Sequence, residues 1–197
     1  MARVFIAVQP PPSVYTSIDQ VHKKLRSADP SVKPVKSRNL HVTVKYLGNK
    51  NEIDTEAVSE VARETTERHS KFNVELRGLS AFPTVEEPRD IWIGIGEGAK
   101  ELEEIHDDLQ RRLTAMDLAP KDRWEYAPHM TVAQKDDENQ FKDRHGAEIR
   151  GLDGIPKYIQ RENLENYGEF QIREIKLLRT TKKNGVEQNV VRKFALD

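Results

Sequence analysis

The sequence predicts a mixed fold of strands and helices, arranged as two similar lobes related by a pseudo-twofold axis. The pattern His-x-Thr-Val occurs twice, at His41 and at His129, which are 88 positions apart. When the chain is shifted against itself by 88 residues, a strand, a helix and a second strand each meet a counterpart without a gap. We therefore expect the two His-x-Thr strands to meet across a cleft.

The elements of the first half follow from local hydrophobic patterns. Residues 3–8, RVFIAV, are β-branched and aromatic and precede three prolines, which predicts a short strand. Apolar residues at helical spacing predict a helix over residues 13–27 with Ser13 as its N-cap. Residues 40–47, LHVTVKYL, alternate as a strand does. Two further patterns predict a helix over residues 54–69 and a strand over residues 72–79.

The second half begins with the counterparts of these elements. They are a strand at residues 91–95, a helix at residues 99–116 and a strand at residues 129–134. The rest of the chain predicts a polar loop within 135–168, a short helix over about 156–166 from Pro156, and strands at 169–180 and 186–196 joined by a hairpin turn at 182–185.

Composition narrows the class of protein. The chain has 197 residues, 32 basic and 33 acidic, and a formal net charge of −1. We predict a single bilobal domain over residues 1–197, and the balanced charge excludes a protein that coats long nucleic acid by charge alone. The mean hydropathy is −0.76, and no apolar run reaches the ~18 residues of a membrane span. With no export signal we expect a cytoplasmic protein, and the absence of cysteine excludes disulfides and thiolate chemistry.

A basic segment surrounds the first motif. Between Asp29 and Glu52 there is no acidic residue. A solvated basic face is the usual reading of such a run, but here the run also contains the best motif in the chain. We therefore expect some of its cations to contact phosphate. They are Lys33, Lys36, Arg38, Lys45 and Lys50.

The two motifs present a specific set of side chains. Residues i and i+2 of a strand point to the same face, so His41 stands beside Thr43, and His129 stands beside Thr131. Two imidazoles that titrate near neutrality can act together, one as base and one as acid. Hydroxyls and nearby cations can hold a tetrahedral anion. This set suits phosphoester cleavage by in-line displacement.

Other chemistries have less support in the sequence. Catalytic zinc usually has three protein ligands, and no further ligand pattern accompanies either motif, so we predict no metal and no cofactor. There is no Gly-x-Ser-x-Gly elbow for a serine nucleophile. The remaining histidines have no companion motif and are expected to be structural. They are His22, His69, His106 and His145.

The motifs resemble those of a known superfamily. The segments NLHVTVKYLG at 39–48 and PHMTVAQ at 128–134 are similar to the paired signatures of the 2H phosphoesterases, and in particular of the RNA 2′,3′-cyclic phosphodiesterases, also called 2′-5′ RNA ligases. The opening RVFIAVQPP, GLSAFP at 78–83 and PRDIWIGI at 88–95 extend the resemblance over nearly the whole chain. It implies an α+β fold in which two antiparallel sheets flank a central cleft with helices outside.

The resemblance also implies roles for individual residues. His41 and His129 would be the catalytic pair, and Thr43 and Thr131 would bind the phosphate. The second motif of the family commonly ends in arginine, where this chain has Gln134. Three cations near the first motif and one after the second are candidates to replace that charge: Lys36, Arg38, Lys45 and Lys135.

Three residues near the motifs have two possible placements. Strand alternation puts Lys45 on the face of His41, where it could contact phosphate. The same alternation puts Tyr46 in the core with Val44, whereas the resemblance places an aromatic residue there near the substrate base. Trp124, shortly before the second motif, is either a lid or a core residue.

The implied activity is hydrolysis of a 2′,3′-cyclic phosphate at an RNA end, or on a nucleotide, to a 2′-phosphate. It includes a weak, reversible joining of RNA ends through a 2′-5′ bond. We also expect a monomer with no membrane partner. Two alternatives are a nucleotide or RNA-end binding module with little turnover, and a phosphodiesterase for 2′-5′ oligoadenylates or a small cyclic nucleotide. Retention of both histidines and both threonines favours an enzyme.

Overall fold

The predicted repeat is present in the structure, a computed structural model that describes residues 2–50, 54–135, 154–182 and 186–197. The first unit comprises β1 (Ala2–Val8), α1 (Tyr15–Ala28) and β3 (Val42–Lys50), and the second comprises β5 (Pro88–Ile95), α3 (Ala99–Ala115) and β6 (His129–Lys135). The other elements are η1 (Pro12–Val14), β2 (Val32–Pro34), η2 (Ser37–Asn39), α2 (Thr55–Thr66), β4 (Phe72–Pro83), α4 (Gly154–Arg161), β7 (Asn166–Ile172), β8 (Glu174–Lys182) and β9 (Val186–Ala195).

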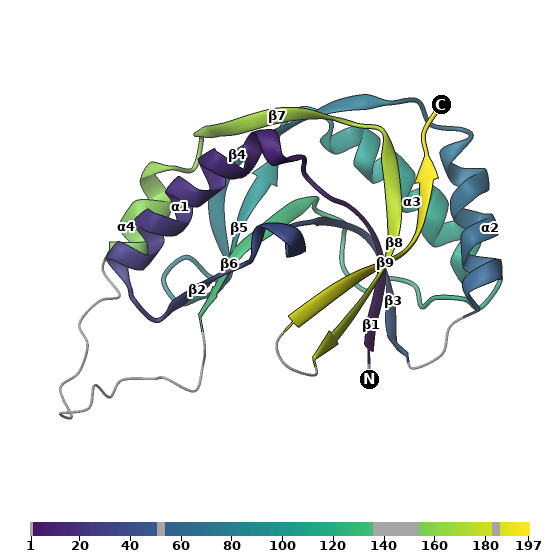
Figure 1. Ribbon diagram of the computed structural model, residues 1–197, viewed down its shortest axis with the longest axis horizontal. Coiled ribbons are helices and arrows are strands. Elements are labelled where there is room, and N and C mark those ends of the chain that lie inside the picture. Colours follow the sequence, from purple (N-terminus) through teal and green to yellow (C-terminus); the bar gives the residue numbers. More distant parts are fainter. Residues whose placement is uncertain (1, 51–53, 136–153, 183–185) are drawn as a thin grey trace.

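The strands form one curved antiparallel sheet with two halves. Its order is β7-β4-β5-β6-β3-β1-β8-β9, with β2 added to β6. The halves join between β6 and β3 through a single residue pair, Val42 with Met130. In Figure 1 the sheet curves like an arch, with α1 and α4 outside one half and α2 and α3 outside the other. The α+β, two-lobed prediction is confirmed, with the two expected sheets joined at this one pair.

The two units exchange their helices. Helix α1 follows β1 in the chain but packs against β2, β6 and β7 of the other half. Helix α3 follows β5 but packs against β3. Each motif strand is therefore backed by the helix of the other unit.

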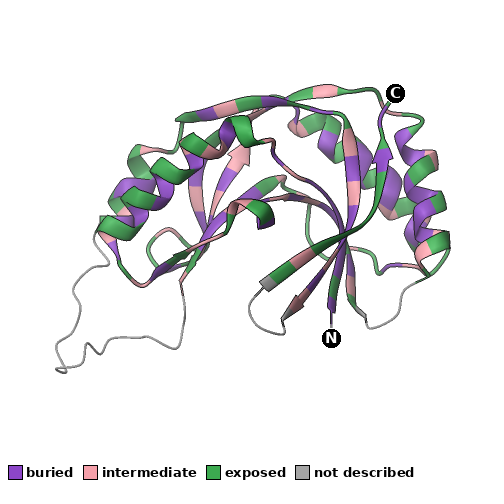
Figure 2. Cartoon of the chain, viewed as in Figure 1, coloured by how far each residue is buried: buried purple, intermediate pink, exposed green. Residues whose placement is uncertain are grey.

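The core lies between the sheet and these helices. The apolar positions that predicted the helices are buried, for example Ile18 and Leu25 of α1 and Ile105 and Leu109 of α3, each 0% exposed. Burial of side chains of this size contributes roughly 1.5–3 kcal/mol each. Figure 2 shows the buried positions on the inner faces of the helices and along the strands. Among the described residues, no α-helix lies on the opposite, concave face of the sheet in Figure 1, where the short η2 is the coil drawn beneath the arch.

Some sequence-based expectations differ from the structure. The strand predicted over 169–180 is two strands, because the chain leaves one edge of the sheet after Ile172 and joins the other half at Glu174. Pro30 and Pro34 by themselves predict a loop, but residues Val32–Pro34 form β2, an edge strand that tolerates Pro34. Ser13 lies in η1 and does not cap α1. The predicted turn at 183–185 and loop at 136–153 lie outside the described residues. Within the described chain, no helix is long and apolar enough to cross a membrane.

Candidate active site

The register between β3 and β6 brings the two motifs together. Val42 and Met130 are paired and fully buried, so their neighbours in sequence point to the opposite, concave face. Continuing this antiparallel register sets His41 across from Thr131, and Thr43 across from His129. The two histidines are then diagonal neighbours, for which Cα atoms lie about 7–8 Å apart. The structure thus brings both imidazoles and both hydroxyls to the concave face of the sheet. The part of this face around His41, Thr43, His129 and Thr131 is the motif face.

Each motif histidine is oriented by a backbone carbonyl. His41 Nδ1 lies 2.7 Å from the carbonyl oxygen of Asn39, and His129 Nδ1 lies 2.7 Å from that of Ala127. A carbonyl oxygen only accepts, so Nδ1 carries the proton and donates in both cases. The neutral tautomer of each ring therefore keeps Nε2 unprotonated and available as a base.

The surroundings of the two imidazoles differ. The His41 ring stacks on Phe5 with 4.8 Å between centroids, and the side-chain amide of Gln188 lies 2.9 Å from its Nδ1. Burial lowers the pKa of His41, and positive charge on His129 lowers it further. His129 is exposed and its ring lies 5.4 Å from that of Trp92. His41 is therefore the member of the pair whose environment favours the neutral form.

A β-bulge in β3 changes which residues reach this face. In the pairing with β1, Ile6 pairs with Lys45 and Ala7 pairs with Thr43, so Val44 has no counterpart. An extra residue of this kind reverses the alternation of the residues that follow it. The expectation that Lys45 shares the face of His41 is therefore wrong. Its side chain is fully buried, and its Nζ lies 2.8 Å from Asp122 on the helix side.

The same bulge moves Tyr46 out of the core. Tyr46 pairs with Phe5, whose ring stacks on His41, so it lies on the motif face. It is 36% exposed, and the core placement predicted by alternation is wrong. Trp124 is 86% exposed, which excludes its core placement as well.

Strand β6 contains an equivalent bulge. Ile91 pairs with Ala133 and Trp92 pairs with Thr131, so Val132 is the extra residue, 88 positions after Val44. Gln134 consequently lies on the motif face, exposed, as Tyr46 does in β3. Its Nε2 donates to Asp90 Oδ1 at 2.7 Å.

Cations of the basic segment between Asp29 and Glu52 lie close to the motif face. Lys33 of β2 pairs with Gln134, and paired residues of an antiparallel ladder share a face. Arg38 is exposed in η2, three residues before His41, and Lys36 is exposed beside it. Lys135 forms an ion pair with Asp29 at 2.9 Å. The structure therefore adds Lys33 to the candidates for the charge that Gln134 lacks.

No group of three metal-ligating side chains is found among the described residues.

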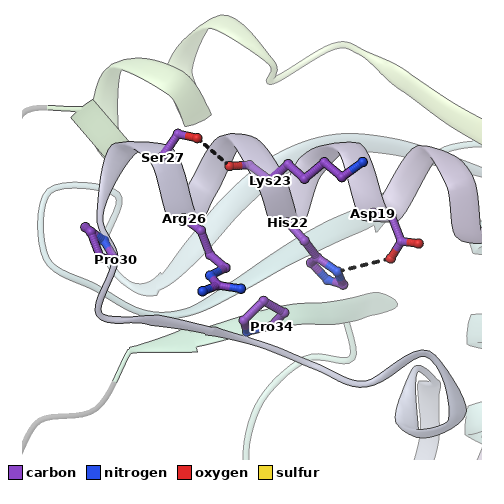
Figure 3. Close-up of a pocket in the computed structure, with 7 residues that line it drawn as sticks. All are labelled: Asp19, His22, Lys23, Arg26, Ser27, Pro30 and Pro34. Atoms are coloured by element: carbon purple, nitrogen blue, oxygen red, sulfur yellow. Dashed lines mark hydrogen bonds and ion pairs between the residues drawn. The ribbon is translucent and has the colours of Figure 1, made fainter.

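A separate surface groove of about 460 Å³ lies along α1 and β2, lined by Asp19, His22, Lys23, Arg26, Ser27, Pro30 and Pro34 (Figure 3). Its His22 ring is within 2.9 Å of the Val132 carbonyl oxygen, which belongs to the bulge of β6. The groove is thus on the helix side of the sheet, away from the motif face.

Sequence reasoning missed several residues around the pair. Phe5 and Trp92 could have been found by alternation, since their neighbours Ile6 and Ile93 were clear core positions. Gln188 could not, because it reaches His41 from β9 across 147 positions of sequence. Asp90 is another such neighbour, brought beside Gln134 by strand pairing alone.

The fold and the paired His-x-Thr strands define a phosphoesterase of the two-histidine class. The family model of the 2′-5′ RNA ligase superfamily matches residues 10–184, and the chain belongs to this superfamily. An RNA 2′,3′-cyclic phosphodiesterase of Aeropyrum pernix is 39% identical over 103 residues, covering 52% of this chain and 57% of that protein. One of Methanocaldococcus jannaschii is 29% identical over 182 residues, 91% of each chain. A crystal structure from Thermus thermophilus superposes with a TM-score of 0.72 at 23% identity, covering 98% of this chain and 97% of the other. The resemblance in the motifs is thereby confirmed.

Proposed function

We propose that this protein is an RNA 2′,3′-cyclic phosphodiesterase that hydrolyses the cyclic phosphate to a 2′-phosphate without a metal ion. One observation carries the proposal. Two imidazoles on one sheet face are each held through Nδ1 by a backbone carbonyl, so both Nε2 atoms remain for the substrate. The names of the curated relatives support the same reaction.

In this reaction the two histidines have opposite protonation states. Neutral His41 takes a proton from the attacking water through Nε2, because burial lowers its pKa. Water oxygen bonds to phosphorus as the bond to the 3′ oxygen breaks in line. Protonated His129 gives its proton to the departing 3′ oxygen, which leaves a 2′-phosphate and a 3′-hydroxyl. If the 5′-hydroxyl of another RNA replaces water, the same displacement forms a 2′-5′ bond.

The remaining residues of the face bind the substrate. The hydroxyls of Thr43 and Thr131 donate to the non-bridging phosphate oxygens. Lys33, beside Gln134 in the ladder, supplies positive charge at the end of β6. The exposed ring of Tyr46 offers a surface for the base, and the exposed Arg38, three residues before His41, is available to a preceding phosphate of an RNA.

Chelation and pH test the proposed acid–base pair. We expect full turnover of a 2′,3′-cyclic nucleotide after exhaustive treatment with EDTA, and a bell-shaped dependence of kcat/KM on pH. The acidic limb should have its midpoint below 6.5, the usual imidazole pKa, because the pKa of His41 is lowered. Activity that is lost in EDTA and restored by a divalent ion would contradict metal independence.

The basic segment should distinguish RNA from a mononucleotide. Neutralising Lys33, Lys36 and Arg38 together should weaken binding of an RNA with a cyclic phosphate end and flatten its salt dependence, because fewer counterions are released. A cyclic mononucleotide should be affected much less.

The matched control neutralises Lys23, Lys24 and Arg26, three exposed cations on α1. This control changes the net charge equally but lies behind the sheet, so we expect little effect on either substrate. Equal losses for both triple variants would mean that only net charge matters, and equal losses on both substrates would count against a contact with the RNA backbone.

A binding module with little turnover is the second candidate. The observation that favours it is Gln134, which supplies no charge and whose amide donates to the Asp90 carboxylate at 2.7 Å. Steady-state turnover of an RNA ending in a cyclic phosphate separates the two candidates. A 2′-5′ oligoadenylate in the same assay tests the related phosphodiesterase. A monomeric state and a cytoplasmic location stay predictions.

A further inference from the structure

Two buried histidines outside the motifs contact the bulges of the motif strands. His106 of α3 is 2% exposed, and its Nδ1 lies 2.7 Å from the carbonyl oxygen of Val44. His22 of α1 is 9% exposed, and its Nε2 lies 2.9 Å from the carbonyl oxygen of Val132. Val44 and Val132 are the extra residues of the two bulges. The same backbone atom is therefore held in both halves of the molecule.

The contacts are alike although the histidines are not equivalent in sequence. Shifted by 88 positions, His22 meets Gln110 and His106 meets Ile18. His22 therefore lies one helical turn after Ile18 in α1, and His106 lies one helical turn before Gln110 in α3. The two rings accordingly use different nitrogens, Nδ1 in one and Nε2 in the other. Because the helices are exchanged, each histidine reaches the motif strand of the other unit.

Further polar contacts surround the bulge of β3. Tyr126 donates its hydroxyl proton to the Thr43 carbonyl oxygen at 2.9 Å, and its ring stacks on His106 with centroids 4.2 Å apart and planes 1° apart. Asp122 lies 3.6 Å from His106 Nε2 and pairs with Lys45. The bulge of β6 is held more simply, because Val132 accepts from the backbone N–H of Val35 at 2.8 Å in addition to His22.

The position of each bulge decides which residue reaches the substrate. The bulge of β3 puts Lys45 on the helix side of the sheet and Tyr46 on the motif face. The bulge of β6 likewise puts Ala133 on the helix side and Gln134 on the motif face. If the extra residue moved by one position, the neighbouring side chains would exchange faces. A donor that fixes the bulge carbonyl therefore also fixes the geometry of the threonine and of the residue three positions after it.

We propose that His106 and His22 are positioning residues, which hold the two bulges so that Thr43 with Tyr46, and Thr131 with Gln134, face the substrate. The inference rests on the proposed function for what these side chains bind. It assigns no contact with substrate to either histidine. We expect the larger effect at His106, whose ring also stacks on Tyr126, whereas Val132 accepts from the backbone N–H of Val35 as well as from His22.

Substitution by asparagine and by glutamine tests this proposal, because each amide replaces only one of the ring nitrogens. The Nδ2 of asparagine lies near the position of histidine Nδ1, and the Nε2 of glutamine lies near that of Nε2. We expect His106→Gln to lower kcat/KM by about tenfold to hundredfold, the cost of a small misplacement, and His106→Asn to retain most of it. At position 22 the order should be reversed, with His22→Gln more active than His22→Asn and a smaller difference.

A role limited to core packing predicts another result. Glutamine is closer in volume to histidine, so packing alone would make the glutamine variant the better one at both positions. The same order at both sites, or equal activities within both pairs, would overturn the proposal. The substitution His69→Gln, at a partly exposed histidine that touches neither motif strand in any described contact, serves as the control and should leave kcat/KM unchanged.

Amide hydrogen exchange keeps this test independent of the proposed function. If the unmodified protein turns over no cyclic phosphate, the proposed function fails, but exchange over residues 43–47 still reports on the bulge. We expect faster exchange there in His106→Gln than in His106→Asn, at equal exchange over β8. Equal rates in the two variants would overturn the inference even if the protein is active.

Discussion

Replacing either His41 or His129 with alanine should lower kcat/KM on a 2′,3′-cyclic phosphate by at least about 10²-fold, the lower range for acid–base catalysis. Both imidazoles present Nε2 on the same face, and base and acid act in one displacement. Removing the second should therefore add little to the loss caused by the first, since residues that act as a unit are not additive. Steady-state kinetics of both single variants and of the double variant measure this.

Asparagine at each position and alanine at His69 are the controls. His41→Asn and His129→Asn keep a donor for the backbone carbonyl but have no group that titrates near neutrality, so they should be as impaired as the alanine variants. His69→Ala should be fully active. Near-normal turnover by a folded His41→Ala or His129→Ala variant would contradict the assignment of the pair.

Replacing Lys45 with methionine should mainly affect stability. The ammonium group is buried and lies 2.8 Å from Asp122, 3.1 Å from Gln110 Oε1 and 2.9 Å from the carbonyl oxygen of Pro120. Methionine keeps most of the apolar stem but removes this donor, and of the three acceptors Gln110 Oε1 still accepts from the backbone N–H of Asp122. Leaving buried acceptors without a donor costs about 1–3 kcal/mol, which we expect as a lower free energy of unfolding in urea.

The same variant separates the two placements of Lys45. A lysine on the motif face would contact phosphate, so its loss would raise KM at unchanged stability. The exposed Lys36→Met substitution is the matched control and should change the free energy of unfolding by less than about 0.5 kcal/mol. A stable Lys45→Met protein with a raised KM would contradict the buried placement.

The sequence alone predicted the features that depend on repetition and on local pattern. The offset of 88 residues identified the two units, and the spacing of His41 and Thr43 placed both on one face of a strand. Both inferences use short-range geometry that a bulge further along the strand does not disturb. They are sufficient to predict the paired imidazoles and hydroxyls.

The bulges explain why the prediction failed from Lys45 onward. No glycine or proline marks the extra residue at Val44, and the run Val42, Thr43 and Val44 is made of β-branched residues that suit a regular strand equally well. The repeat of 88 residues did indicate that position 45 is buried. The counterpart of Lys45 is Ala133, and alanine in a strand of this kind is a core residue. Asp122, which pairs with Lys45, shows why lysine could be buried there, but it reaches Lys45 only through tertiary packing.

The boundary between β7 and β8 shows a second limit. Ile172 and Glu174 belong to opposite halves of the sheet, with only Arg173 between them. The alternation changes phase here, from Phe170 and Ile172 to Ile175 and Leu177, but which edge each strand joins depends on partners distant in sequence. Local propensity therefore predicted that strands were present but not where the chain changes partner.

A change of leaving group tests the central claim most directly, which is that His41 is the base and His129 the acid in opening a 2′,3′-cyclic phosphate. Sulfur in place of the 3′ oxygen leaves as a thiolate that needs no proton, so the acid becomes dispensable while the base does not. We predict that His129→Ala recovers most of the unmodified protein's rate on this substrate and that His41→Ala stays impaired by about 10²-fold. Recovery by His41→Ala instead, or by neither variant, would contradict this assignment of the two histidines.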